Sequence, residues 1–358
     1  MTLFDSPAFE GHEGVHAFYD AKTGLKTIIA VHSTARGPAA GGCRMWDYPT
    51  AEDALADALK LSRAMSYKNA MADLELGGGK SVIMGDARTQ KTPALFEAFG
   101  RAVEAVGGRY WTAEDVGVSP ADLMHARKHT RYVAGLEGHP AASGDPSPVT
   151  AEGVFRGVRL CVRRALNRDL DGVTVAIQGV GHVGGYLAQK LHAAGARLII
   201  ADVNREAVER IAAATGAQVA APSAIFDAPA DVFAPCAMGG ALNLDTLARL
   251  QARIIAGAAN NQLADADTGR MIFEKGLLYA PDYVINGGGI INVAGEIRAL
   301  ERGEAFDPAW VDAKLDRLSQ TLDEVLEQAA RERRPTHEVA NEIARARIAG
   351  PSGARAAA

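Results

Sequence analysis

Residues 174–204 read TVAIQGVGHVGGYLAQKLHAAGARLIIADVN, and this stretch decides the fold of the second half of the chain. An apolar run opens it, a helical pattern follows, and a second apolar run ends in Asp202. Gly179, Gly181 and Gly184 form a G-x-G-x-x-G motif between the first run and the helix. The pattern predicts a βαβ unit that binds a dinucleotide, because the motif lies between a strand and a helix.

Each glycine has a separate task in such a unit. Gly179 permits the tight turn, Gly181 lets a pyrophosphate approach the backbone, and Gly184 allows the helix to pack on the strand. The helix N-terminus then attracts the phosphates. A carboxylate at Asp202 accepts hydrogen bonds from a ribose 2′-OH and repels a 2′-phosphate, which predicts NAD. Arg205 could partly offset that repulsion, so tolerance of NADP stays open.

Strands and helices alternate after residue 150, which predicts a parallel sheet with helices on both faces. The expected strands lie at 173–178, 197–201, 231–235, 253–257 and 282–285. In the first half we expect strands at 26–33, 80–86 and from 109, and helices after Thr50 and over 92–107. The Gly-, Pro- and Ser-rich segment 138–150 is interpreted as a linker and hinge.

Composition excludes several classes of protein. The 358 residues are 48% hydrophobic and 23% charged, with a formal net charge of -5, so the basic excess of a nucleic-acid binder is missing. The three cysteines show no metal-ligand spacing, so we expect no metal, no disulfide framework and a cytoplasmic location. No apolar run is long enough to span a bilayer, and the first residues lack a signal-peptide pattern, so no membrane partner is expected.

Two lysines stand out in MSYKNAMADLELGGGKSV, residues 65–82. Lys80 directly follows three glycines, which we interpret as a turn or close-fitting loop, and Lys68 precedes them. A dehydrogenase needs a group that manages protons. One lysine can anchor a substrate carboxylate, while a desolvated one can act as a base. Asp115, in TAEDVG (112–117), could exchange a proton with a substrate amine. The alternative is a pair of surface lysines beside a turn.

The context of these residues resembles a known family. Successive blocks are GPAAGGCRM, KNAMADLELGGGKSVIMGD, TAEDVG, GDPSPVTAEGV, QGVGHVG, APCAMGGALN, AGAANNQL and APDYVINGGGIINVAGE. They are similar, in order and from about residue 25 to 300, to the amino-acid dehydrogenases of glutamate, leucine, valine and phenylalanine. The leucine and phenylalanine branch is the most similar. The resemblance implies reversible conversion of an L-amino acid, water and NAD⁺ into a 2-oxo acid, ammonium and NADH.

The resemblance also assigns roles to residues. Lys80 would activate water, Lys68 with the Gly42 backbone would bind the substrate carboxylate, and Asp115 would handle the amino group. Asn261 would lie where substrate meets nicotinamide, and Thr150 would contact the nicotinamide amide. Other expected cofactor contacts are His182, Val183, Val203, Cys236, Ala237 and Asn260. Other expected substrate contacts are Ala40, Met65, Ala113, Ile290 and Val293.

Ala40 bears on the substrate. Acidic-substrate members of the family have a lysine at this position, so glutamate is not expected. Ala113 matches the leucine branch, and Ile290 lies between the leucine and phenylalanine patterns. Both branches usually have leucine where this chain has Ala40, and each buried CH₂ is worth about 0.8 kcal/mol. The pocket is therefore enlarged unless Met45, Met65 or a backbone shift fills the space.

We therefore expect a dehydrogenase of leucine or another branched-chain amino acid. The first alternative is a phenylalanine or other bulky amino acid. A more distant alternative is an NAD-binding protein without catalysis, which should have lost Lys80 or Asp115.

The family fold implies two α/β domains with an active-site cleft between them. Residues 1–140 would form a substrate-binding and catalytic domain, joined by C-terminal helices at about 326–358. Residues 141–325 would form the Rossmann-type NAD-binding domain. A homo-oligomer is expected, and no signal in the sequence chooses its size.

Overall fold

The computed structural model describes residues 3–237 and 239–350. These residues divide into two compact units, which are described separately. The first contains 3–144, 290–311 and 344–350, and the second contains 145–237, 239–289 and 312–343. In the described part of the chain, no helix is long and apolar enough to cross a membrane.

The first unit is built on a five-stranded sheet of order β1-β2-β4-β3-β5. β1 and β2 run antiparallel to their neighbours, whereas β4, β3 and β5 are parallel to one another. The strands are β1 (Gly14–Asp20), β2 (Leu25–Ser33), β3 (Ala39–Trp46), β4 (Gly77–Met84) and β5 (Tyr110–Glu114). The predicted strands at 26–33 and from 109 are thus confirmed.

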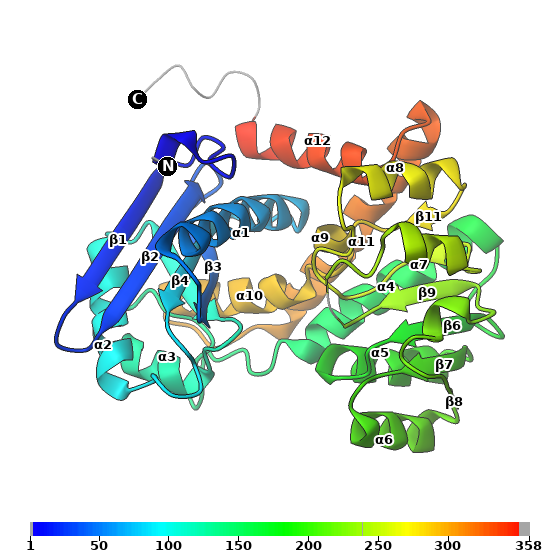
Figure 1. The fold of residues 1–358 in the computed structure, drawn as a ribbon, viewed down its shortest axis with the longest axis horizontal. Helices are drawn as coiled ribbons and strands as arrows, with labels where there is room; N and C mark the ends of the chain where they lie inside the picture. The colour runs from blue at the N-terminus through cyan, green and yellow to red at the C-terminus, as the bar shows by residue number, and fades with distance from the viewer. Residues whose placement is uncertain (1–2, 238, 351–358) are drawn as a thin grey trace. The chain divides into compact units, whose positions relative to one another are not determined.

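Helices cover both faces of this sheet (Figure 1). One face packs on α1 (Ala51–Met71), through Ala54, Ala58 and Leu59. The other packs on α2 (Pro93–Ala105) and α3 (Pro120–Arg127). Thr50 caps α1 by accepting the Asp53 N–H, and Gly107 and Gly108 follow α2 with positive φ, so both predicted helices are confirmed. A short 3₁₀ turn, η1 (Leu3–Asp5), precedes the sheet.

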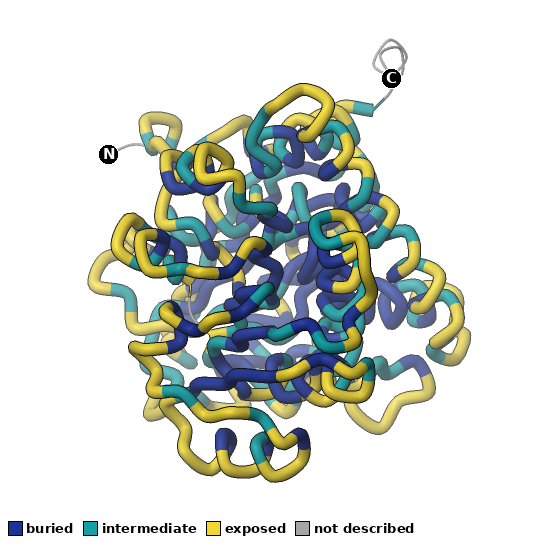
Figure 2. The backbone as a smooth tube through the Cα atoms, turned by 90° about the vertical axis from the view of Figure 1, so that its right-hand side faces the viewer, coloured by how far each residue is buried: buried dark blue, intermediate teal, exposed yellow. Residues whose placement is uncertain are grey.

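The second unit holds a six-stranded parallel sheet of order β11-β10-β9-β6-β7-β8. Its central strands are almost completely buried (Figure 2). The strands are β6 (Thr174–Gln178), β7 (Arg197–Ala201), β8 (Gln218–Val219), β9 (Val232–Pro235), β10 (Ile254–Ile255) and β11 (Leu278–Tyr279). The helical elements up to α9 are α4 (Ser147–Leu166), α5 (His182–Ala193), α6 (Arg205–Thr215), η2 (Ile225–Asp227), α7 (Leu244–Arg249), α8 (Ala266–Glu274) and α9 (Asp282–Ile285). The α/β fold with a Rossmann-type sheet is therefore confirmed.

Three assignments differ from the sequence-based expectations. Residues 282–285 are the helical turn α9 and not a strand, because the chain leaves the sheet at β11 and Pro281 starts the turn. The expected linker 138–150 ends early, because Ser147 already begins α4. The expected ranges 141–325 and 326–358 also differ from the division into units, which groups 290–311 with the first unit and 312–343 with the second.

The last helices explain this difference. α10 (Gly288–Arg302) begins in the second unit and continues into the first, and α11 (Pro308–Glu332) and α12 (Thr336–Ala349) follow. Within the first unit, Glu296 of α10 accepts the N–H groups of Leu136 and Ser143. Tyr283 Oη donates to Asn341 of α12 inside the second unit. Residues 351–358 of the expected C-terminal range lie outside the described part.

The glycine triplet 77–79 is not the turn that was expected. It forms the first half of β4, between β2 and β3. A Cβ on Gly78 would lie 2.1 Å from the backbone nitrogen of Ser66 in α1, and a Cβ on Gly79 would lie 2.6 Å from the Tyr110 ring. The glycines are thus required by close packing on both faces of the strand and not by a positive φ.

We predict that Gly78→Ala lowers the thermal unfolding temperature of the protein. The added methyl must displace the backbone of α1, and such overpacking costs about 1–3 kcal/mol or more. The control is Gly153→Ala in α4, where the nearest atom to the new Cβ is Leu315 Cδ2 at 3.4 Å, an ordinary contact. Scanning calorimetry of both variants checks the prediction, and equal unfolding temperatures would contradict it.

Candidate active site

The candidate catalytic group of the first unit is an ion pair between Lys80 of β4 and Asp115, the residue after β5. Lys80 Nζ donates to Asp115 Oδ2, and the lysine is only 6% exposed. Burial by itself raises the pKa of Asp115, but the charges of Lys80 and Arg44 outweigh it and hold that pKa below its ordinary value. Asp115 is therefore a carboxylate at neutral pH, held next to the buried Lys80 side chain.

Missing side chains on β3 make this approach possible. A Cβ on Gly42 would lie 2.8 Å from the Asp115 Cβ and 2.4 Å from the Glu114 carbonyl oxygen. A Cβ on Gly41 would lie 1.9 Å from the Gly79 carbonyl oxygen and 3.1 Å from Met65 Cγ. The strands that carry the ion pair are consequently closer than side chains would allow, and Met65 of α1 lies directly against β3.

α1 also brings Lys68 to this region. Its neighbour Ser66 contacts Gly78, and Asn69 Nδ2 donates to the Gly77 carbonyl at 2.5 Å and the Ala40 carbonyl at 3.5 Å. Lys68 therefore belongs to the helical turn that packs on the glycine strand. Ala40 is 1% exposed and pairs with Gly78 and with Trp111 of β5, one residue before the Gly41–Thr112 pair.

Of the remaining expected substrate contacts, Ala113, Ile290 and Val293 lie in the first unit and Asn261 lies in the second. Ala113 pairs with Gly42 and is 5% exposed. Ile290 and Val293 lie one helical turn apart on α10, where Ile290 is buried and Val293 half-buried. Met45, considered as a filler of the space near Ala40, instead belongs to the core that faces α2 and α3.

Sequence reasoning missed three residues around Asp115. Arg44 Nε donates to Asp115 Oδ2 at 3.2 Å, and another nitrogen of the same guanidinium donates to Asp57 Oδ2 at 3.0 Å. Tyr48 Oη donates to the same Asp57 oxygen at 2.6 Å. One signal was available, because Gly42 and Arg44 are two residues apart on one strand and thus face the same side.

The candidate cofactor site is the glycine turn of the second unit. Gly179 has a φ of +95°, and a Cβ on Gly184 would lie 2.0 Å from the Gly179 carbonyl oxygen, so both positions require glycine. A Cβ on Gly181 would meet no atom within 4 Å, and no side chain caps the start of α5, at His182 and Val183. An open turn beside an uncapped helix N-terminus fits a dinucleotide pyrophosphate.

Asp202 follows β7 and is hydrogen-bonded to this turn. Its Oδ2 accepts the Val180 N–H at 2.7 Å and its Oδ1 accepts the Asn204 N–H at 2.8 Å. Val203 is 91% exposed. Arg205 donates to Glu209 at 2.8 Å, and both side chains are exposed. The arginine is thus paired along α6.

Cys236 and Ala237, two further expected cofactor contacts, lie beside the turn. Ala237 would be within 3 Å of a Cβ on Gly179, and Cys236 donates its N–H to the Gln178 carbonyl at 2.7 Å. Asn260 Oδ1 accepts from Asn286, and Asn261 has a φ of +50°, a left-handed conformation that asparagine tolerates better than most residues. Both Asn260 and Asn261 are exposed.

Thr150 lies in the first turn of α4 and is hydrogen-bonded to Pro146, the residue before that helix. Its hydroxyl donates to the Pro146 carbonyl at 2.9 Å, and a Cβ on Gly289 would lie 2.9 Å from that hydroxyl. The glycines at the start of α10 therefore leave room for Thr150.

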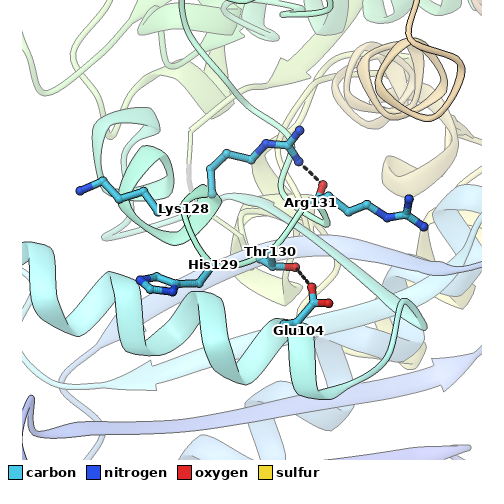
Figure 3. A pocket seen from close by; sticks show the side chains of 6 residues that line it. Glu104, Lys128, His129, Thr130 and Arg131 are labelled. Atoms are coloured by element: carbon cyan, nitrogen blue, oxygen red, sulfur yellow. Dashed lines mark hydrogen bonds between the residues drawn. The ribbon is translucent and has the colours of Figure 1, made fainter.

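A separate hollow of about 450 Å³ on the first unit takes no part in this arrangement. Figure 3 shows that Lys128 and Arg131 point away from each other. Arg127 donates to the Arg131 carbonyl, and Thr130 donates to Glu104 at 2.7 Å. The residues that line this hollow are Glu104, Arg127, Lys128, His129, Thr130 and Arg131. None of them is an expected site residue.

Comparison with known proteins defines the class of this chain. Residues 12–132 match the family model "Glu/Leu/Phe/Val dehydrogenase, dimerisation domain", and residues 146–202 and 198–355 match "Glutamate/Leucine/Phenylalanine/Valine dehydrogenase". A leucine dehydrogenase of Geobacillus stearothermophilus is 45% identical over 97% of this chain and 94% of its own length. A phenylalanine dehydrogenase of Bacillus thermotolerans is 42% identical over 97% and 91%.

A solved structure is similar over nearly the whole chain. The crystal structure of L-tryptophan dehydrogenase from Nostoc punctiforme has a TM-score of 0.82 and 39% identity, over 95% of this chain and 96% of that one. The protein is thus an amino-acid dehydrogenase, an oxidoreductase that acts on CH–NH₂ groups with a nicotinamide dinucleotide. Within this class, the chain belongs to the glutamate/leucine/phenylalanine/valine dehydrogenase family.

Proposed function

We propose that this protein catalyses NAD-dependent oxidative deamination of L-leucine and related branched-chain amino acids, with Lys80 and Asp115 as its catalytic residues. The observation that carries the mechanism is the buried Lys80–Asp115 pair beside the glycine strands. The overall reaction converts the zwitterionic amino acid, NAD⁺ and water into the 2-oxo acid, ammonium, NADH and one proton.

The chain's own residues divide the proton transfers. Lys68 binds the substrate carboxylate, and the Asp115 carboxylate accepts a proton from the substrate ammonium. A bound nicotinamide would accept the hydride that leaves Cα. Lys80 first releases its own proton to solvent and then, as the amine, takes a proton from water as the water oxygen attacks the resulting substrate iminium carbon. Asp115 then returns its proton to the amino group. As the C–N bond breaks and the C=O bond of the 2-oxo acid forms, the hydroxyl proton passes to the departing ammonia, which leaves as ammonium.

Apolar lining supports a branched-chain substrate. Ala40, Ala113 and Ile290 are buried and uncharged, so these three positions offer no cation to a side-chain carboxylate. Met65 lies against Gly41, the next residue of the same strand, and so adds an apolar side chain beside Ala40. The leucine dehydrogenase of Bacillus subtilis, which is 46% identical, agrees with this preference. Phenylalanine remains the second candidate, because an unfilled Ala40 position would admit a ring.

We further propose that the protein is a homo-oligomer, since its first half matches a domain described as a dimerisation domain. The expected cytoplasmic location stays a prediction.

We predict that Lys80→Ala lowers kcat by about 10² to 10⁴, the usual effect of removing a general base. NADH affinity should stay within a few-fold of the wild type, because the cofactor residues lie in the second unit. The control is Lys60→Ala, an exposed lysine of α1. Steady-state kinetics and NADH fluorescence titration make the comparison, and retention of more than a tenth of kcat would refute the assignment.

We predict that NAD⁺ gives the higher kcat/KM. The Asp202 carboxylate repels a 2′-phosphate, and Arg205 is paired with Glu209. Arg205→Ala should consequently leave the ratio of kcat/KM for the two cofactors almost unchanged. Kinetics with NAD⁺ and NADP⁺ test both statements. A wild type that uses NADP⁺ equally well, and loses that ability in Arg205→Ala, would show that the arginine governs the ribose site.

We predict that Ala40→Leu raises the kcat/KM ratio of leucine over phenylalanine at least tenfold. The three added carbons would contact a short branched side chain but clash with a phenyl ring, and one methylene of fit discriminates by about 1–3 kcal/mol. Kinetics with valine, leucine and phenylalanine in wild type and variant give the ratio. An unchanged ratio would mean that Ala40 does not face the substrate or that Met65 already fills the space.

A further inference from the structure

We propose that Arg44 is a positioning residue for the deamination reaction, which fixes the Asp115 carboxylate beside Lys80 by bridging it to Asp57 and Tyr48. This inference rests on the function proposed above. Its evidence is a continuous set of contacts that runs Lys80–Asp115–Arg44–Asp57–Tyr48 and joins β4, the end of β5, β3 and α1.

The geometry requires a guanidinium. Arg44 uses Nε for Asp115 and a terminal nitrogen for Asp57, at 3.2 and 3.0 Å. A planar guanidinium holds these two donors in fixed positions, whereas a lysine has a single nitrogen on a flexible stem. Arg44 can therefore set the distance between two carboxylates on different elements, which a lysine cannot do.

The surroundings favour a rigid arrangement. The side chains of Arg44, Asp57 and Asp115 are 25%, 28% and 23% exposed, so water screens them only in part. Charges alternate in sign along the set, and each anion lies next to at least one cation. Asp57 also accepts a hydrogen bond from the Tyr48 hydroxyl. This bond fixes the Asp57 carboxylate in its position against Arg44.

The same contact affects the charge on Asp115. After burial, which acts in the opposite direction, Lys80 and Arg44 are the main influences that lower the pKa of this carboxyl. An arginine does not lose its proton in the working pH range, so its influence persists when Lys80 serves as a base. Among the described residues, the charged or titratable groups that interact with Asp115 include Lys80, Arg44, Tyr48 and Cys43, and Asp57 is joined to it through Arg44.

The test compares Arg44→Gln with Arg44→Lys by the pH profile of kcat/KM. Arg44→Gln removes both charge and bridge, so kcat should fall at least tenfold. The Arg44 charge favours the deprotonated form of the nearby groups that must be free of protons for the reaction, so its loss should move the acidic limb of the profile to higher pH. Arg44→Lys keeps the charge without the bridge, so the limb should return toward wild type while kcat stays low.

Three further variants complete the set. Arg101→Gln removes another guanidinium of the first unit, paired with Asp20 at 3.1 Å, and should leave kcat and the acidic limb unchanged. Tyr48→Phe and Asp57→Asn weaken the bridge while Arg44 itself is unchanged. Tyr48→Phe should lower kcat, and Asp57→Asn should lower it further. They report on the bridge even if Arg44→Gln does not fold, which circular dichroism would reveal.

The outcomes are distinct. Full kcat in Arg44→Lys would overturn positioning and leave only a charge effect. A drop in unfolding temperature in the folded variants, without any change in kcat or in the limb, would overturn the proposal in favour of a structural role. A wild type without amino-acid dehydrogenase activity, or a fully active Lys80→Ala, would instead refute the proposed function itself.

Discussion

Close backbone approach along β3 and β4 is the constraint on which the first unit depends. Gly41, Gly42, Gly78 and Gly79 leave no room for a Cβ, because the atoms of α1, β5 or the neighbouring strand already occupy that space. Helix α1 can then lie directly on the sheet, with Ser66 against Gly78. Lys80 directly follows these glycines on β4, and its side chain reaches Asp115.

Burial makes the resulting ion pair both useful and sensitive to change. Taking charges out of water costs several kcal/mol per ion, so a buried cation is stable only with a close partner. Lys80 has that partner in Asp115, and Asp115 has a second one in Arg44. Removal of any member leaves its neighbour without full compensation, which ties the stability of this region to the groups proposed for proton transfer.

The dinucleotide-binding turn could be predicted in detail, because its chemistry is local: a strand, three glycines and a helix lie within one short segment. The secondary structure around Lys80 could not, since a glycine triplet usually indicates a turn. Only tertiary contacts, from Ser66 on one side and Tyr110 on the other, make Gly77–Gly79 a central strand.

The same limit explains other differences. Asp57 accepts a hydrogen bond from Arg44 on another element, and Tyr48 donates to Asp57, so no local pattern in the sequence predicts these contacts. Strands β8, β10 and β11 have two residues each, which is too short to show a reliable alternation of apolar and polar residues. The sequence therefore predicts a strand at 282–285, where the structure has the helical turn α9. The family resemblance supplied what local patterns lacked, because it assigned catalytic roles to both Lys80 and Asp115.

Asp202 connects the proposed choice of cofactor to the shape of the glycine turn. Its Oδ2 is the acceptor for the N–H of Val180, the residue between Gly179 and Gly181. An engineer who replaces this aspartate to admit a phosphorylated ribose also removes a hydrogen bond from the turn that should hold the pyrophosphate. Retargeting the enzyme to another coenzyme therefore calls for a replacement that keeps an acceptor oxygen, such as serine or asparagine, together with a new cation nearby.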